Sequence, residues 1–332
     1  MMDPEPVATR PDTLLHNERE VVRSAGRQAI STFLDAHTCF SVLRASGKVV
    51  VFDTRIPIQL AFYALVEHDM QCAPLWDPAL CQFVGLLTVT DFIDILRHYR
   101  KLGLDVSTLA TRSIAEILND PSIQELRSFL SADTNTSLKQ ACLLLHRNNL
   151  DFLPIMFPED MRVLATVTYT NILEHLVTHF REQRRLFDDT IYDLGIGTYH
   201  DKLVTVGADQ KLSAVLELLG QHNLSACPVV EAGSGKILGV YSRSDITFLA
   251  TASDAEDAIA NLDLTLQEIM GQQRNDVTTP DALHTCSKGH TLQSIFEYFA
   301  QLHFNRLYVV DEKDVVVGVV SARDLVAYFL EE

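Results

Sequence analysis

Apolar residues recur along this chain in four similar blocks. Each block contains a segment of about a dozen residues with apolar positions at helical spacing: "QLAFYALVEHD", "LKQACLLLHRNN", "KLSAVLELLGQHN" and "LQSIFEYFAQLHF". Two β-rich runs follow, such as "CPVVE" and "ILGVYS" in the third block, and then a second helical segment, such as "DLVAYFLEE" in the fourth. The pattern predicts a unit of strand, helix, strand, strand and helix, and hence a mixed α/β (α+β) fold.

A short motif closes the second β-rich run of every block. It reads "GLLTVTD" at 85–91, "ATVTYTN" at 165–171, "GVYSRSD" at 239–245 and "GVVSARD" at 318–324. The final residues of these motifs are separated by 80, 74 and 79 positions, which indicates four repeats. A unit this small buries its own core poorly, so neighbouring units are expected to pair.

The period divides the chain into five segments. A polar, Pro-rich segment at 1–23 is expected to be disordered. The four repeats are expected at 24–104, 105–185, 186–255 and 256–332. The first two repeats and the last two form pairs, with the charged stretch 181–189 between the pairs.

Composition narrows the class of protein. Formal net charge is −17, which opposes binding to DNA or RNA. No apolar run is long enough to span a membrane, and the first residues lack the apolar core of a signal peptide. The six cysteines are far apart and favour reduced thiols over a disulfide framework. We therefore expect a soluble cytoplasmic or nuclear protein with no nucleic-acid or membrane partner.

The repeated motif has two interpretations. A Ser or Thr followed three residues later by an acid, as in Ser242 and Asp245, is typical of a capping box at a helix start. Alternatively, glycine lets a ligand approach the strand, helix N–H groups bind anions, and the carboxylate accepts both hydroxyls of a ribose. The second interpretation predicts a nucleoside phosphate ligand. Repetition of the motif with a fixed glycine favours it.

Two details bear on this choice. Arg243 and Arg323 stand at helix starts, where a cation opposes the helix dipole, and either an anionic ligand or neighbouring carboxylates would offset that cost. The second block keeps Thr168 as a cap but has Ala165 and Asn171 in place of the glycine and the acid. Three blocks therefore retain the ligand-binding pattern.

These motifs resemble those of CBS domains, named after cystathionine β-synthase, which pair into Bateman modules. The string "VVFDTRIPIQLAFYALVEHDMQCAPLWDPALCQFVGLLTVTDFIDIL" is similar to the first repeat of γ regulatory subunits of AMP-activated, or sucrose-non-fermenting-type, protein kinases. "IGTYHDKLVTV", "LSACPVV" and "RLYVVDEKDVVVGVVSARDL" carry the same likeness, which covers residues 28–332. The resemblance implies four CBS repeats in two Bateman modules that pack head to head into a pseudo-symmetric disk, with AMP, ADP or ATP bound near its centre.

The resemblance also implies which residues contact the nucleotide. The aspartates would hold the ribose hydroxyls, the hydroxyl side chains and arginines would face the phosphates, and two leucines, Leu203 and Leu224, would flank the adenine. In chain order the implied contacts are Leu86, Leu87, Thr88, Val89, Thr90, Asp91, Thr198, Leu203, Leu224, Ser225, Ser242, Arg243, Ser244, Asp245, Arg274, Arg306, Ser321, Ala322, Arg323 and Asp324.

Departures from the family pattern remove some of the expected phosphate contacts. Basic or histidine residues of the animal-type family are replaced here by Gln71, Asp151, Phe152, Thr170, Asn171 and Asn305. Each lost charge-assisted hydrogen bond costs about 1.5–3 kcal/mol of binding. We expect the third and fourth clefts to be the best preserved, and the site that uses Asp91 to bind phosphate poorly or not at all.

Two other patterns suggest chemistry only weakly. Gly195-Ile196-Gly197 resembles part of a dinucleotide-binding loop but lacks the third glycine. His175 and His179 lie four residues apart beside Glu174, as in some metal sites, but no third ligand is evident. We therefore predict no metal site and no catalytic residue.

For function, the resemblance implies a non-catalytic adenine-nucleotide sensor that assembles with a kinase catalytic α subunit and a scaffolding β subunit. The lost basic residues favour an alternative, a scaffold with the same fold that ignores nucleotide. An enzyme is disfavoured, because the repeats leave no room for a separate catalytic domain.

Overall fold

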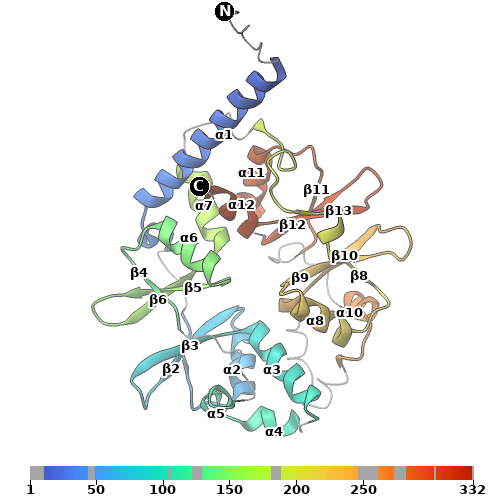
Figure 1. Ribbon diagram of the computed structural model, residues 1–332. Helices are drawn as coiled ribbons and strands as arrows, with labels where there is room; N and C mark the ends of the chain where they lie inside the picture. Colours follow the sequence, from blue (N-terminus) through green and yellow to red (C-terminus); the bar gives the residue numbers. More distant parts are fainter. Residues whose placement is uncertain are drawn as a thin grey trace, which may run out of the picture.

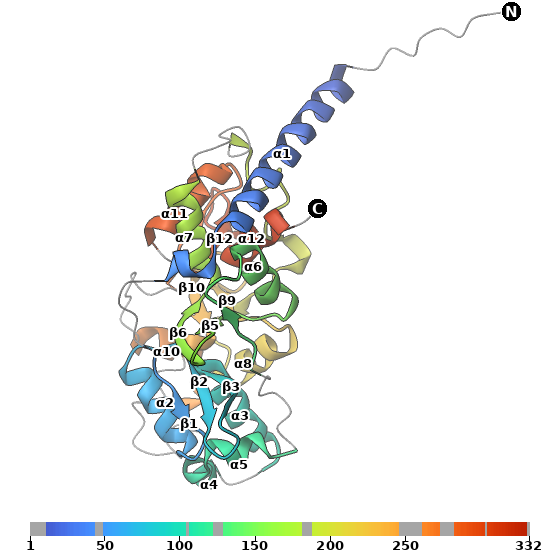
Figure 2. The same ribbon diagram turned by 90° about the vertical axis from the view of Figure 1, so that its left-hand side faces the viewer.

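The computed structural model describes residues 11–43, 49–103, 106–121, 129–180, 188–245, 261–272, 282–302 and 304–330. Four small β-sheets lie around a common centre (Figure 1). The view turned by 90° shows that the body is flattened, apart from the first helix, α1, which projects from it (Figure 2). This arrangement agrees with the disk that the family resemblance implies.

Unit 1 shows how the sequence pattern produces each repeat. Its elements are β1 (Phe52–Asp53), α2 (Ile58–Glu67), β2 (Cys72–Asp77), β3 (Gln82–Thr88) and α3 (Val89–Lys101). β1 is parallel and β3 antiparallel to the central strand β2. Helix α2 buries Ile58, Ala61, Phe62 and Leu65, which are the positions of one helix face.

The other units repeat this order. Unit 2 contains β4 (Ala132–Asp133), α6 (Leu138–Arg147), β5 (Leu153–Phe157), β6 (Arg162–Val167) and α7 (Tyr169–His179). Unit 3 contains β8 (Val206–Gly207), α8 (Leu212–Gln221), β9 (Ala226–Val230) and β10 (Ile237–Ser242). Unit 4 contains β11 (Thr285–Cys286), α11 (Leu292–Leu302), β12 (Arg306–Val310), β13 (Val316–Ser321) and α12 (Ala322–Leu330). The expected second helix of unit 3 lies mostly outside the described residues.

The segment that leads into each unit packs on the other unit of its pair. These segments are α1 (Pro11–Ala36) with η1 (Cys39–Val42), α4 (Val106–Thr111) with α5 (Ile114–Leu118), β7 (Thr198–Tyr199) with η3 (His200–Lys202), and α10 (Leu266–Gln272). The backbone contacts that hold them are Thr38–Ser137, Pro57–Ser113, Thr198–Val319 and Lys211–Thr265. Units 1 and 2, and units 3 and 4, are therefore interlocked.

Two hydrophobic cores join the pairs to each other. One core combines unit 1 with unit 3, through residues such as Phe62, Ile93, Leu216 and Tyr241. The other core combines unit 2 with unit 4 and includes α1. Because a fully buried large apolar side chain stabilises by about 1.5–3 kcal/mol, cores of this size fix the four units relative to one another.

The N-terminal segment differs from the expectation of disorder. Residues 11–23 belong to helix α1, while residues 1–10 lie outside the described residues. Proline is well tolerated at a first helical position, where its missing N–H costs nothing. Arg23 Nε donates to Asp189 Oδ2 at 2.8 Å, which ties α1 to the segment before unit 3.

Three expectations concern chemistry that a sequence pattern can suggest. All six cysteines are free thiols, as predicted, and five of them are buried. Within the described ranges, no three His, Cys, Asp or Glu side chains are grouped so that they could hold a metal ion. Among the same residues, no helix has both the length and the apolar character needed to cross a membrane.

Candidate functional site

The strand-to-helix junctions carry the repeated motif in a single geometry. In unit 4, Ser321 donates to Asp324 Oδ2 from its backbone N at 2.8 Å and from its hydroxyl at 2.7 Å. The Asp324 N–H donates back to Ser321 Oγ at 3.2 Å. These reciprocal bonds form a capping box at the start of α12.

The capping box does not require a carboxylate. In unit 2, Asn171 Oδ1 accepts from Thr168 N at 3.0 Å and from Thr168 Oγ1 at 2.9 Å. In unit 1, Asp91 Oδ2 accepts from both groups of Thr88 at 2.7 Å. An amide therefore satisfies the same bonds as an acid, and the negative charge of the other three junctions is not needed for the cap.

Unit 3 varies the pattern. Ser242 N donates to Asp245 Oδ2 at 2.7 Å, and Ser242 Oγ lies 3.0 Å from Ser244 Oγ. Ser242 is 2% exposed, which makes it the most buried of the four hydroxyl residues that begin these junctions. Both hydroxyls of the motif lie at the end of β10, as the sequence predicts.

The apolar residues of the predicted contact set occupy different places. Leu87, Val89 and Ala322 are 1%, 2% and 4% exposed, so their side chains belong to the hydrophobic cores. Only the backbone of these three residues is left to face a ligand, and their contact with a nucleotide stays a prediction. Leu203 and Leu224, predicted to flank adenine, are half-buried.

The motif glycines of units 3 and 4 are approached closely by the chain itself. A Cβ at Gly239 would lie 2.3 Å from Met270 Cε, and a Cβ at Gly318 would lie 2.4 Å from Tyr199 Cδ1. Met270 in α10 and Tyr199 in β7 both belong to segments that lead into one unit and pack on the other unit of the pair. The glycines thus make room for side chains of the interlocking segments, and close approach by a ligand stays a prediction.

Residues of units 3 and 4 meet around Ser225. Arg306, at the start of β12, is 9% exposed, and its Nη2 donates to Ser225 Oγ at 3.1 Å. The Ser225 carbonyl accepts from Arg243 N at 2.8 Å and from Ser242 Oγ at 3.4 Å. A buried cation, two hydroxyls and the Asp245 junction therefore share one locality.

The two junction arginines reach across to the opposite pair. Arg243 Nη1 donates to Asp94 Oδ2 in α3 of unit 1 at 3.1 Å. Arg323 donates to Asn149 Oδ1 and, at 3.4 Å, to the His146 carbonyl of unit 2. Sequence reasoning predicted the charge at these positions but not its protein partners, because those lie far away in the chain.

The remaining predicted residues that the structure describes lie in the sheet of unit 4 and in unit 1. Thr198 is half-buried and pairs with Val319 of β13, so it lies in the sheet of unit 4 rather than that of unit 3. Thr90 Oγ1 lies 2.8 Å from Thr88 Oγ1, and Leu86 pairs with Pro74 across the sheet of unit 1. Arg274 lies outside the described residues.

Ionisable groups beside the junctions are held in their neutral forms. Burial raises the pKa of Tyr241 well above its usual value, and the nearby Asp245 charge raises it further. Burial raises the pKa of Cys227 to about 12, although Arg306 lowers it in part. Burial also raises the pKa of Cys72 to about 12. These thiols stay protonated at neutral pH and are poor nucleophiles.

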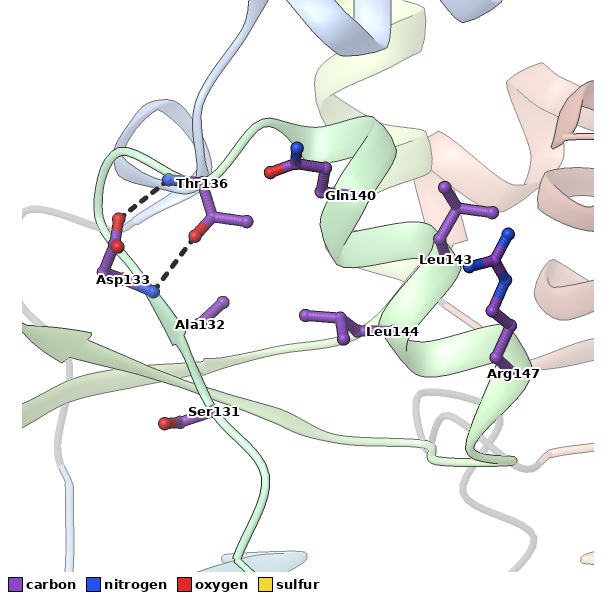
Figure 3. A pocket seen from close by; sticks show the side chains of 8 residues that line it. All are labelled: Ser131, Ala132, Asp133, Thr136, Gln140, Leu143, Leu144 and Arg147. Atoms are coloured by element: carbon purple, nitrogen blue, oxygen red, sulfur yellow. Dashed lines mark hydrogen bonds between the residues drawn. The ribbon is translucent and has the colours of Figure 1, made fainter.

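A separate surface pocket lies between β4 and α6 of unit 2 (Figure 3). It has a volume of about 400 Å³, and its lining comprises Ser131, Ala132, Asp133, Thr136, Gln140, Leu143, Leu144 and Arg147. Thr136 N donates to Asp133 Oδ1 at 2.9 Å and fixes the turn at its edge. None of the residues predicted to contact nucleotide lines this pocket.

Comparison with known proteins identifies the family. The family model of the CBS domain matches residues 123–178, 196–250 and 275–331. The fold matches that of a protein from Methanocaldococcus jannaschii, described as a proposed archaeal homologue of g-AMPK, with a TM-score of 0.70 and 18% identity. That match covers 88% of this chain and 99% of the other. The chain belongs to the CBS-domain family.

Curated relatives confirm the predicted resemblance to γ subunits. The 5'-AMP-activated protein kinase subunit gamma of Dictyostelium discoideum is 31% identical over 323 residues, covering 96% of this chain and 56% of the relative. The human gamma-3 subunit is 32% identical over 308 residues, covering 92% of this chain and 61% of the relative. The chain thus spans less than two thirds of the length of these relatives.

Proposed function

We propose that this chain is a non-catalytic regulatory subunit that senses adenine nucleotides, acting as the γ subunit of a heterotrimeric AMP-activated-type protein kinase. One observation carries the proposal. Asn171 supports the same helix cap as the acids of the other units, so the cap does not require the negative charge that Asp91, Asp245 and Asp324 bring to these junctions. A carboxylate at this position can accept hydrogen bonds from the two hydroxyls of a ribose.

The charge around Ser225 supports a phosphate ligand in the same place. Arg306 is almost fully buried in a chain whose net charge is −17, and it points at a serine hydroxyl. A guanidinium carries several donors in a planar arrangement that matches the oxygens of a phosphate. Arg306 is therefore suited to the phosphate of AMP, ADP or ATP, with the sugar at Asp245 or Asp324.

Regulation follows from differential binding. A nucleotide shifts a conformational equilibrium only to the extent that it binds one state more tightly than another. In this chain the junctions adjoin both the leading segments that interlock a pair and the cores between pairs, so a phosphate bound there would act on the contacts that set the geometry of the disk. A kinase catalytic α subunit and a scaffolding β subunit would detect that geometry, in the cytoplasm or nucleus.

Neutralising the junction acids is expected to weaken AMP binding about tenfold, because a charge-assisted hydrogen bond contributes about 1.5–3 kcal/mol. Asp245→Asn and Asp324→Asn suit this test, since Asn171 shows that asparagine preserves the cap. Isothermal calorimetry with AMP, ADP and ATP measures the affinity of each variant.

Asn171→Asp is the matched control, because it adds an acid at a junction that lacks the other family residues. It should not create a site as tight as those of units 3 and 4. If AMP affinity is the same in the wild type and in both Asp→Asn variants, the sensor assignment is wrong. Complete absence of a thermal shift with any of the three nucleotides supports the nucleotide-blind scaffold, which the ion pair of Arg243 with Asp94 favours.

A further inference from the structure

The ion pair between Arg243 and Asp94 links the junction of unit 3 to unit 1 across 149 residues of sequence. The two side chains are 14% and 22% exposed, so the pair is largely shielded from solvent. In Figure 1, α3 lies on the side of unit 1 that faces α8 of unit 3. A guanidinium predicted to meet a phosphate is thus held by a carboxylate of the opposite pair.

Asp94 is fixed in this position by a second arginine. Arg97 Nη1 donates to Asp94 Oδ1 at 3.3 Å, so the two carboxylate oxygens are shared between two guanidinium groups. Arg97 also packs over α8, where a Cβ at Gly220 would lie 2.6 Å from its Nη1. Unit 1 therefore presents a preformed anion to unit 3.

Arg243 retains capacity for a further acceptor. Its Nε is buried and, among the residues that the structure describes, has no hydrogen-bond partner. Its backbone N–H is used by the Ser225 carbonyl, so its position beside the Asp245 junction is fixed. Because buried polar atoms are normally satisfied, this orphaned donor points to an acceptor that arrives with a ligand.

The equivalent arginine of unit 4 offers an internal comparison. Arg323 also reaches across to the opposite pair, but its acceptors there are the amide oxygen of Asn149 and the carbonyl of His146. Both acceptors are neutral. The cross-pair contact of unit 3 therefore contains an anion where the corresponding contact of unit 4 contains a dipole.

We propose that Asp94 is an internal competitor for Arg243, which exchanges this carboxylate for the phosphate of a nucleotide bound at unit 3. The inference rests on the proposed function and extends it to regulation. Binding at the Asp245 cleft then releases a contact between units 1 and 3, while binding at the Asp324 cleft releases only neutral contacts. The Asp245 cleft therefore binds phosphate more weakly than the Asp324 cleft does, and it is more strongly coupled to the contact between the pairs.

A double-mutant cycle tests the competition. AMP affinity is measured by calorimetry for the otherwise wild-type chain, Asp94→Asn, Arg243→Gln and the double variant, with Asp324→Asn in all four to silence the unit 4 cleft. Asp94→Asn should tighten AMP binding about threefold to tenfold, the range expected for removing one partly buried competing ion pair. In the Arg243→Gln background the same change should have no effect.

Adenosine, which lacks phosphate, is the matched probe, and its affinity should not respond to Asp94→Asn. Equal AMP affinity with and without Asp94, while Arg243→Gln weakens AMP, overturns the competition but leaves the proposed function intact. If Asp94→Asn increases the affinity for AMP and for adenosine equally, the competition is also overturned. Failure of all four proteins and the wild type to bind AMP overturns both proposals.

A reciprocal variant tests the competition even if Asp94→Asn does not fold. Asn149→Asp places an anion against Arg323, and it should weaken AMP binding about threefold to tenfold when Asp245→Asn silences the unit 3 cleft. Unchanged binding there contradicts the proposal independently of Asp94.

Discussion

Replacing Gly197 with alanine is expected to lower the free energy of unfolding by about 3 kcal/mol or more. Its φ of 105° lies in a region that side chains rarely adopt, which costs about 1–3 kcal/mol. A Cβ there would also lie 2.6 Å from the Val319 carbonyl oxygen and 2.7 Å from Val320 Cγ2. Relieving that clash requires β13 to move, at a further cost of about 1–3 kcal/mol. Urea unfolding followed by circular dichroism measures the loss.

Gly195 provides the control within the same loop. Its φ of 70° is also positive, but nothing lies within 4 Å of a Cβ built on it. Gly195→Ala should therefore cost only the conformational penalty, about 1–2 kcal/mol. Equal losses for the two variants would show that the contact with β13 contributes nothing. The expected difference assigns the Gly-Ile-Gly pattern to the interlocking of units 3 and 4 rather than to a cofactor loop.

The repeat pattern was sufficient to predict the elements of each unit, because local sequence determines them. Apolar spacing placed the helices, as Ile58, Ala61 and Leu65 show for α2, and the spacing of the motifs gave the number of units. The packing of each leading segment on the other unit of its pair was not predicted. Its contacts, such as Thr38 with Ser137, join positions about a hundred residues apart that follow no periodic rule.

The candidate site, too, was predicted only in part from the sequence. The capping geometry of Ser321 and Asp324 depends on residues three apart, so the sequence predicted it. The partner of Arg243 could not be predicted, because Asp94 belongs to a helix of the other pair and carries no motif of its own. The sequence analysis did not specify side-chain direction within the predicted contact set, and the structure places the side chains of Leu87 and Val89 in the core.

The packing of His175 predicts a loss of stability in acid. This ring is 9% exposed and lies between His179, with ring centroids 4.4 Å apart, and His37, at 5.1 Å. Burial chiefly, and then the neighbouring charges of His179 and His37, lower the pKa of His175 to about 4. His175 lies on the packed face of helix α7.

The sign of the effect follows from proton linkage. Above pH 6.5, His175 is neutral in both the folded and the unfolded chain and contributes no pH dependence. As pH falls from about 6.5 towards 4, the unfolded chain binds a proton that the folded chain does not, so stability decreases. The loss levels off below about pH 4, after up to about 3 kcal/mol.

Substituting His175 with leucine should abolish this component while preserving the packing between α7 and the end of α1. The free energy of unfolding, measured by urea titration from pH 7 to pH 4, should then decrease less steeply for the variant than for the wild type. His179→Leu is the control: His179 is exposed and only adds to the shift of its neighbour, so the acid loss should shrink in part. Parallel curves for His175→Leu and wild type would mean that the buried ring takes up a proton in the folded state at no cost, which the burial of His175 opposes.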